Sequence, residues 1–285
     1  MEHASCELIR NESVNGELFS LEFAWKGLLP KAGQFFMIRP KRSGVFLGRP
    51  IGAAHWLEFP DEPVINEYWH KVYELEKPGG INGAITFFIA MRGKGTRELS
   101  DMSVRSQARP GEEAELIGPL GNAWTDFLPP AESLGGKPVA LISGGVGFAP
   151  LVALSSEDPG HGFDLYAGFK TDPRGKRNED LFSRAAYKTV TVATEDGTLG
   201  QKGRITDFLE PEKYAAVCTC GPEPMMKAVA EKCAAADVPC FVSLERRMAC
   251  GVGACLGCAV KLAARTCRCC ADGPIFDARE VIFDG

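Results

Sequence analysis

The sequence predicts a multi-domain fold of the β plus α/β class: an antiparallel β-barrel, an α/β domain with a parallel sheet, and a small C-terminal domain. The first indication is length, because 285 residues are about twice a typical domain. The second is a change from alternating apolar and polar residues to short apolar runs separated by helical segments. The third is that six of the eleven cysteines lie between residues 250 and 270.

Residues 1–130 have the pattern of half-buried strands. Alternating stretches separated by Gly and Pro turns occur at Glu17–Trp25, Gln34–Ile38 and Glu113–Ile117. Short strands at this spacing are typical of a small antiparallel barrel. The segment at about 54–82 breaks the alternation with aromatic, charged and proline residues, so we expect an insertion there.

Two segments of the barrel region carry groups that suit a phosphate. Arg49 follows an apolar strand and offers a forked donor, and the turn Gly93–Thr96 precedes a short helix that Thr96 is expected to open. Taken without its context, Arg49 is better explained as part of a surface ion pair.

Residues 131–239 have the pattern of an α/β domain. Four short apolar runs suit a buried parallel sheet: Pro138–Ile142, Asp164–Ala167, Thr189–Ala193 and Ala215–Thr219. Pro222 is well placed to open a helix that extends to about residue 237. Alternating strands and helices are typical of a nucleotide-binding unit.

Three loops in this region are expected at the carboxyl edge of the sheet, where α/β folds bind ligands. The stretch 141–151 is a strand, a glycine turn and a helix start, although Ala149 and Pro150 stand where the dinucleotide fingerprint has a third glycine. Cys220 ends the last strand before Gly-Pro, and Asp196-Gly197 forms the third loop. A tight connection and a buried structural cysteine are the alternatives, but three loops together favour a nucleotide site.

Residues 240–285 are too few for a large core, and their cysteines suggest a metal cluster. Cys250, Cys255 and Cys258 have the C-x4-C-x2-C spacing of plant-type 2Fe-2S ligation, with interspersed glycines that allow a loop to wrap closely. Spacing alone leaves the fourth ligand open among Cys267, Cys269 and Cys270. Such a cluster carries one electron at a time, which indicates electron transfer.

The order of these motifs resembles the ferredoxin–NADP reductase superfamily. The matching segments are RPIG (49–52), GKGT (93–96), GPLG (118–121), SGGVGFAP (143–150), CGPEPM (220–225) and CGVGACLGC (250–258). The cysteine loop and CADGPIFDAREV (270–281) are similar to the electron-transfer subunits of dihydroorotate dehydrogenase B. The resemblance implies an FAD-binding barrel at 1–130, an NAD(P)-binding domain at 131–239 and a 2Fe-2S domain at 240–285.

The resemblance also implies roles for individual residues. FAD would be lined by Arg49, Pro50, Ile51 and Gly52, with Gly95 and Thr96 at its pyrophosphate and Phe88, Ile89 and Ala90 beside the flavin. The nicotinamide nucleotide would face Gly144, Gly145, Val146 and Gly147, and its ring would face Cys220, Gly221 and Pro222. The cluster ligands would be Cys250, Cys255, Cys258 and Cys270. Gly52 and Ala90 depart from the serine and arginine that are common in the family.

These cofactors explain why no catalytic side chain is expected. A nicotinamide delivers two electrons as hydride and a cluster accepts one, so a flavin is the natural converter. All four histidines lie outside the motifs. The resemblance implies an FMN-containing dihydroorotate dehydrogenase as catalytic partner in a hetero-oligomer for pyrimidine biosynthesis, with electrons running from FMN through the cluster to FAD and NAD+. Arg246, Arg247 and Met248 are candidates for the docking surface.

The nucleotide preference is open to NADP(H). The loop after the second strand of the α/β domain contains four basic residues that could bind a 2′-phosphate or could simply be solvated: Lys170, Arg174, Lys176 and Arg177.

Composition argues against several other classes of function. A net charge of -5 provides no basic face for nucleic acid and no polybasic membrane anchor. The chain shows no signal peptide and no apolar run of the roughly 20 residues needed for membrane insertion, so we expect a cytoplasmic protein. Two alternatives are kept: the same module in another complex, of the ferredoxin–NADP or sulfide dehydrogenase type, and a zinc-stabilised binding module without catalytic function.

Overall fold

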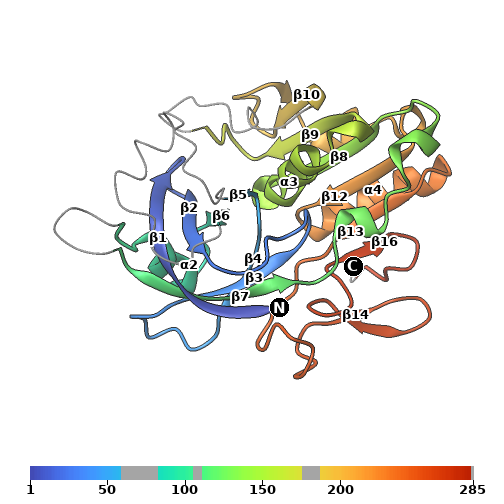
Figure 1. Cartoon of the computed structure of the whole chain (residues 1–285). Coiled ribbons are helices and arrows are strands. Elements are labelled where there is room, and N and C mark those ends of the chain that lie inside the picture. The colour runs from blue at the N-terminus through green and yellow to red at the C-terminus, as the bar shows by residue number, and fades with distance from the viewer. Residues whose placement is uncertain (59–82, 105–110, 175–186, 284–285) are drawn as a thin grey trace.

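The computed structural model describes residues 1–58, 83–104, 111–174 and 187–283 (Figure 1). Within them the strands form two seven-stranded sheets and one two-stranded sheet. The first sheet is antiparallel and the second mostly parallel, which confirms the predicted fold class. Among the described residues no helix has the length and apolar character needed to cross a membrane.

The first sheet curls into a barrel-like shape. Its strands, in spatial order, are β4 (Arg49–Gly52), β3 (Phe35–Pro40), β7 (Glu113–Leu120), β1 (Glu2–Ser13), β2 (Leu18–Trp25), β6 (Gly83–Ala90) and β5 (His55–Glu58). The chain passes directly from edge strand β4 to the opposite edge strand β5, and the Ala54 N–H donates to Thr86 O on β6 at 3.0 Å. Inside, Phe36 makes edge-to-face contacts with Trp25 and Phe87 at 5.0 and 5.5 Å between ring centroids.

The first residues of the expected insertion at about 54–82 belong to the barrel. His55–Glu58 pairs with β6 as strand β5, so these residues belong to the barrel sheet. The remainder of the expected insertion, residues 59–82, lies outside the described residues.

The second sheet joins two of the predicted regions. Its spatial order is β11 (Gln201–Lys202), β10 (Tyr187–Thr194), β9 (Phe163–Phe169), β8 (Val139–Gly144), β12 (Ala216–Cys220), β13 (Cys240–Ser243) and β16 (Ile275–Asp277). All pairs are parallel except β13 with β16. Both β13 and β16 come from residues 240–285, so the C-terminal region shares this sheet with residues 131–239.

Two helices cover opposite faces of the second sheet. Alternate residues of β8 face opposite sides, because Ala140 and Ile142 pack in the core under α4 (Glu223–Ala235) and Val139 and Leu141 in the core under α3 (Ala149–Glu157). Pro222 precedes the first turn of α4, as the sequence predicted. A third helix, α2 (Lys94–Ser100), contacts the barrel strands β3 and β6.

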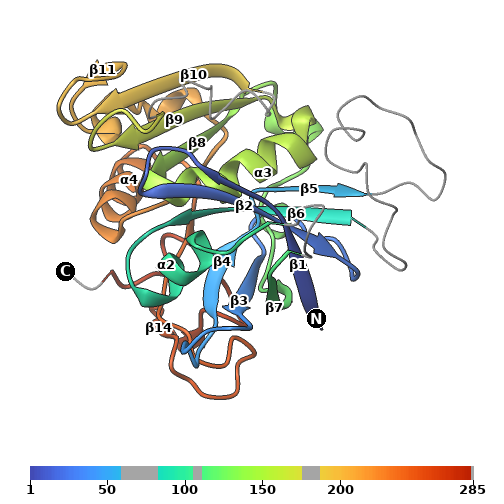
Figure 2. The ribbon, with the colours of Figure 1, turned by 90° about the vertical axis from the view of Figure 1, so that its left-hand side faces the viewer.

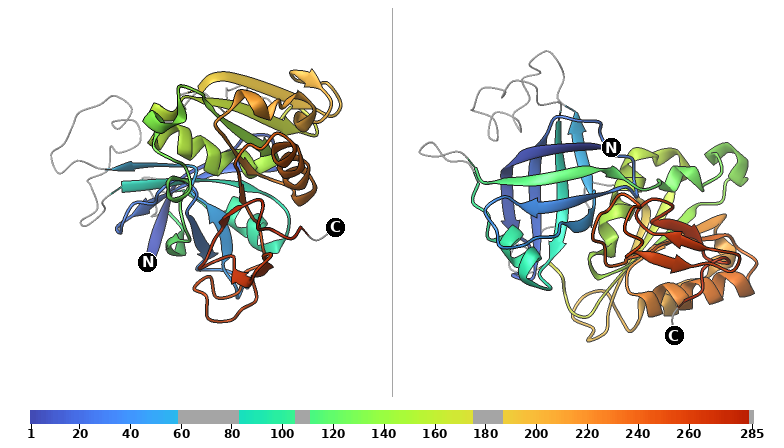
Figure 3. Two further views of the ribbon diagram at one scale, coloured as in Figure 1. Left: turned by 90° about the vertical axis from the view of Figure 1, so that its right-hand side faces the viewer. Right: turned by 90° about the horizontal axis from the view of Figure 1, so that it is seen from below.

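The cysteine-rich segment lies against both sheets (Figure 3). It contains the two-stranded sheet, β14 (Ala259–Lys261) with β15 (Thr266–Arg268). Its buried cysteines share a hydrophobic core with α4 and with Phe35 and Met37 of the barrel.

Candidate functional site

The predicted FAD strand, β4, places Arg49 beside the start of α2. A Cβ added to Gly95 would lie 2.5 Å from Arg49 Nε, so only glycine permits this approach of the guanidinium. Arg49 Nη1 also donates to Leu47 O at 2.7 Å, which fixes the side chain. The structure therefore brings together two residues that the sequence predicted for one phosphate.

Thr96 differs from its predicted position. It occupies the third position of α2 and does not open the helix, because the helix begins at Lys94. Its hydroxyl accepts from the backbone N–H groups of Arg92 and Gly93 at 2.9 and 3.2 Å. The Thr96 side chain thus caps the helix start.

The predicted flavin strand β6 contacts the α/β region through Phe88. The Phe88 ring packs on Phe148 at 5.0 Å between centroids, whereas Ile89 points into the barrel core. Nearby, a Cβ added to Gly52 of β4 would lie 3.7 Å from the Cβ of Pro150 at the start of α3. The barrel strands assigned to FAD therefore meet the glycine turn assigned to the nicotinamide nucleotide.

The two nucleotide loops lie in direct backbone contact. Strands β8 and β12 are adjacent with Ser143 opposite Cys220, so both loops leave the same edge of the sheet. A Cβ on Gly147 would lie 2.3 Å from Cys220 O, and one on Gly144 would lie 2.6 Å from Pro222 Cδ. This spacing leaves no room for a side chain between the loops.

Other residues of these loops have different surroundings. Gly145 has a φ of +56° with open space where a Cβ would be, and Val146 is half-buried. Gly221 has a φ of +152° beside Gly144 N. Cys220 is buried, and this burial raises the pKa of its thiol. Burial therefore favours the neutral thiol of Cys220 over the thiolate that would act as a nucleophile.

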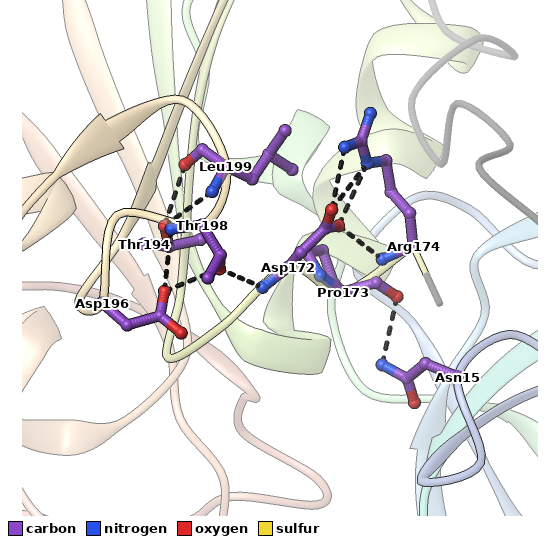
Figure 4. Close-up of polar contacts among 8 residues, drawn as sticks. All are labelled: Asn15, Asp172, Pro173, Arg174, Thr194, Asp196, Thr198 and Leu199. Atoms are coloured by element: carbon purple, nitrogen blue, oxygen red, sulfur yellow. Dashed lines mark hydrogen bonds and ion pairs between the residues drawn. The ribbon is translucent and has the colours of Figure 1, made fainter. Parts of the chain in front are cut away.

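A polar network joins the loops after β9 and β10 (Figure 4). Asp172 accepts from Arg174 Nε at 3.0 Å and Nη2 at 2.8 Å, and this pairing lowers the pKa of the Asp172 carboxyl. The Asp172 N–H donates to Thr198 Oγ1 at 2.9 Å, and the Thr198 hydroxyl donates to Asp196 Oδ1 at 2.6 Å. Arg174, a candidate for a 2′-phosphate, is thus held by a carboxylate; Lys176 and Arg177 lie outside the described residues.

The predicted cluster ligands form two pairs. The thiol of Cys255 influences that of Cys250, and the thiol of Cys258 influences that of Cys270. Backbone N–H groups donate to all four sulfurs: Val252 to Cys250 at 3.4 Å, Gly253 to Cys270 at 3.1 Å, Gly257 to Cys255 at 3.5 Å and Cys270 to Cys258 at 3.4 Å. Such donors stabilise thiolates, and those around Cys250 lower its pKa to about 6.

The contacts of Cys270 differ from those of Cys267 and Cys269, the other two candidates for the fourth ligand. Cys269 Sγ donates to Leu244 O at 3.2 Å, on the side of the second sheet, and Cys267 is buried in β15 opposite Val260. In the described part of the chain, no three Cys, His, Asp or Glu side chains gather closely enough to hold one ion. The two thiol pairs together provide four candidate ligands, the number that a plant-type 2Fe-2S cluster takes.

The loop that carries Cys250, Cys255 and Cys258, called the cluster loop below, packs against the barrel. It lies next to β4, the strand predicted to bind FAD. A Cβ on Gly251 would lie 2.4 Å from Met37 Cγ, and Met37 pairs with Pro50 of β4. Asn122, which the sequence analysis missed, fixes the following segment: its amide donates to Ile275 O at 2.9 Å and accepts from Ile275 N–H at 3.0 Å. An asparagine after the Gly-Pro-Leu-Gly turn was the available signal, because Asn side chains commonly bond backbone groups.

Comparisons with known proteins agree with this geometry. A family model described as the iron-sulfur cluster binding domain of dihydroorotate dehydrogenase B matches residues 245–282. A dihydroorotate dehydrogenase B (NAD(+)) electron transfer subunit from Caldanaerobacter subterraneus subsp. tengcongensis is 35% identical over 283 residues, covering 97% of each chain. The chain belongs to this family. The Clostridium acetobutylicum member is 34% identical over 89% of this chain and 87% of its own.

Solved structures show the same fold at lower identity. The structure of an NADH-dependent reduced ferredoxin-NADP oxidoreductase superposes with a TM-score of 0.70 at 23% identity, covering 98% of this chain and 90% of that one. A ferredoxin reductase of carbazole 1,9a-dioxygenase gives a TM-score of 0.56 at 18% identity over 84% and 66% of the chains. The fold is therefore that of the ferredoxin reductases.

We predict that Cys270→Ser removes the cluster and Cys269→Ser does not. A serine at 269 can still donate to Leu244 O, whereas a serine at 270 lacks the thiolate that Gly253 N–H stabilises. Visible absorption and iron content of anaerobically prepared protein measure the difference. Cys267→Ser is a matched control that should keep full iron. Loss of iron from Cys269→Ser with retention in Cys270→Ser would show the assignment to be wrong.

Gly147→Ala should weaken NADH binding by at least about 10-fold, equivalent to about 1.4 kcal/mol, because the new methyl group meets backbone that cannot rotate away. The bound FAD should be unaffected. Calorimetric titration with NADH measures nucleotide binding. Flavin absorbance measures the bound FAD. Gly160→Ala, where the new methyl group makes only ordinary contacts, is the control. Wild-type NADH affinity in Gly147→Ala would contradict the assigned site.

Proposed function

We propose that this chain is the electron-transfer subunit of a dihydroorotate dehydrogenase and moves electrons between a 2Fe-2S cluster, FAD and NAD(H). One observation carries the proposal: three predicted cofactor regions are contiguous. The cluster loop packs on Met37 of β3, β3 pairs with β4, and Gly52 of β4 faces Pro150 beside the nucleotide loops.

The residues of each region suit the cofactor that we assign to it. We assign FAD to residues 1–130, NAD(H) to residues 131–239 and the cluster to residues 240–285. Arg49 provides a positive charge for the FAD phosphates, and the glycine loops at 144–147 and 221 provide close backbone for the nicotinamide nucleotide. The paired cysteines hold the cluster. When bound, the flavin converts between hydride and single-electron transfer, and the chain contributes position.

The relatives' names indicate the partner and the direction. They are NAD(+)-linked dihydroorotate dehydrogenase B subunits, so we assign an FMN-containing catalytic partner, a hetero-oligomer and a place in pyrimidine biosynthesis. Electrons then run from the partner through the cluster to FAD and NAD+. We assign the chain to the cytoplasm, a reducing compartment that keeps cysteines available as cluster ligands.

The surface around the cluster loop is the proposed docking site for the partner. Of the residues predicted for docking, Arg246 is engaged by Glu223 at 2.8 Å and Met248 packs on the core. Exposed apolar side chains are present instead on the loop before β4 and on the cluster loop: Phe46, Leu47, Val252 and Leu256. Both loops contact Met37 and lie side by side (Figure 2), and Phe46 is 87% exposed, which is typical of an interaction site.

Reconstitution tests the proposal. The holoprotein, mixed anaerobically with the catalytic subunit of dihydroorotate dehydrogenase from the same organism, should support NADH-dependent reduction of orotate, measured by loss of NADH absorbance. The catalytic subunit alone should show less than about one hundredth of this rate, because it lacks the nucleotide site. A holoprotein that oxidises NADH with ferredoxin and not with orotate would assign the chain to the ferredoxin type of complex.

We predict that Asp172→Asn raises kcat/KM for NADPH about 10-fold, with a smaller change for NADH. Removing the carboxylate eliminates repulsion of a 2′-phosphate and releases Arg174, an electrostatic change of about 1.4 kcal/mol. Flavin reduction kinetics with NADH and with NADPH measure the two changes in kcat/KM. In the double variant Asp172→Asn/Arg174→Ala the gain should disappear. An unchanged NADPH rate in Asp172→Asn would show that the network does not face the ribose.

A further inference from the structure

The ion pair between Arg268 and Asp272 closes the short turn that carries Cys270. Asp272 Oδ2 accepts from the Arg268 backbone N–H at 2.8 Å and from Arg268 Nε at 3.0 Å, and Asp272 Oδ1 accepts from Nη2 at 3.0 Å. The Asp272 N–H donates in turn to Arg268 O at 2.8 Å. A two-pronged contact of this kind fixes the direction of the guanidinium as well as its position.

The remaining nitrogen of this guanidinium lies on the cluster loop. Arg268 Nη1 donates to Gly253 O at 3.3 Å, and the Gly253 N–H donates to Cys270 Sγ at 3.1 Å. Gly253 has a φ of +81°, and a Cβ added to it would lie 3.0 Å from the Ala271 Cβ and 3.3 Å from Arg268 Nη1. Glycine therefore allows a positive charge and the sulfur of a predicted ligand to contact the same residue.

A second ion pair in the C-terminal region has similar geometry but a different position. Arg279 donates to Asp277 from its backbone N–H at 2.9 Å, from Nε at 3.2 Å and from Nη2 at 2.9 Å. The sulfurs of Cys270 and Cys258 act electrostatically on Arg268, whereas aspartates act on Arg279. The two arginines thus have similar ion pairs, and Arg268 is the one held on the cluster loop.

A positive charge in this position favours the reduced form of a cluster bound by the four cysteines. Such a cluster gains one negative charge when it accepts an electron, and its reduction potential depends on nearby charge and on hydrogen bonds to its sulfurs. The Arg268 guanidinium is charged at every working pH, because arginine does not lose its proton in proteins. The Asp272 carboxylate has the opposite effect, so removal of either charge should move the potential in a different direction.

We propose that Arg268 sets the reduction potential of the cluster: its charge stabilises the reduced form, and Asp272 holds the guanidinium on the cluster loop while partly offsetting that charge. The inference rests on the proposed function, because it requires a 2Fe-2S cluster on the predicted cysteines. Arg268 acts through its field and through Gly253, so it is a positioning residue and not a ligand. The potential that it sets determines how electrons from NADH divide between the flavin and the cluster.

The test is an anaerobic redox titration of the holoprotein, in which electron paramagnetic resonance measures the reduced cluster. In Arg268→Gln the equilibrium constant for placing an electron on the cluster should fall about 3-fold, which lowers the midpoint potential by about 30 mV. Asp272→Asn should raise the potential, since asparagine can still accept the Arg268 N–H but has no charge. Arg268→Lys keeps the charge and should recover most of the wild-type potential.

Ionic strength distinguishes a charge effect from a change in structure. The Arg268 side chain is 41% exposed, so dissolved salt should screen its field. The potential differences between the variants and the wild type should therefore shrink when the salt concentration rises from about 0.05 M to about 1 M. Arg279→Gln is the matched control, because it removes a similar ion pair at the end of β16. It should leave the potential unchanged at both salt concentrations.

The signs of the shifts decide the outcome. Equal potentials in Arg268→Gln, Asp272→Asn and the wild type would overturn the proposal, as would shifts of the same sign in both variants or an equal shift in Arg279→Gln. If Arg268→Gln loses its iron, Asp272→Asn decides alone: a higher potential supports the charge role, and an unchanged or lower one overturns it. A wild-type protein without a one-electron iron–sulfur signal would instead overturn the proposed function.

Discussion

Asn122, two residues after the end of β7, binds the segment that follows Cys270 with both ends of its side-chain amide and with its backbone. Its backbone N–H donates to Gly273 O at 2.7 Å, and its side chain bonds Ile275 in both directions. The same segment continues into β16 at the edge of the second sheet. One residue of the barrel therefore sets the position of the cluster segment relative to both sheets. Electron transfer depends steeply on distance, so the proposed relay depends on this attachment.

The chain positions the loops that hold its cofactors, whereas a hydrolytic enzyme would supply reactive side chains. Glycines at 144 and 147 permit two loops to touch through their backbones, and Gly95 permits Arg49 to lie on the helix start. Cys220, the most conspicuous reactive side chain of the nucleotide loops, is buried, and this burial raises the pKa of its thiol. This is expected where bound cofactors carry the chemistry and the chain holds them in position.

The sequence predicted the parts of the fold that depend on local pattern. Alternation located β2, β3 and β7, and Pro222 located the start of α4. Short apolar runs located the parallel strands β8, β9, β10 and β12, but not β11 or β13. What it could not predict depends on contacts between distant residues. Asn122 and Asp272 are 150 positions apart, and nothing local shows that they meet. Likewise, the adjacent Cys269 and Cys270 differ only in which side of the chain their sulfurs face.

The central claim is that electrons reach the cluster from NADH only through the flavin. The most direct measurement is anaerobic mixing of NADH with holoprotein and with protein stripped of FAD, following flavin and cluster absorbance separately. Flavin bleaching should precede cluster bleaching in the holoprotein, and the cluster should stay oxidised without FAD. Cluster reduction at the same rate in the stripped protein would contradict it.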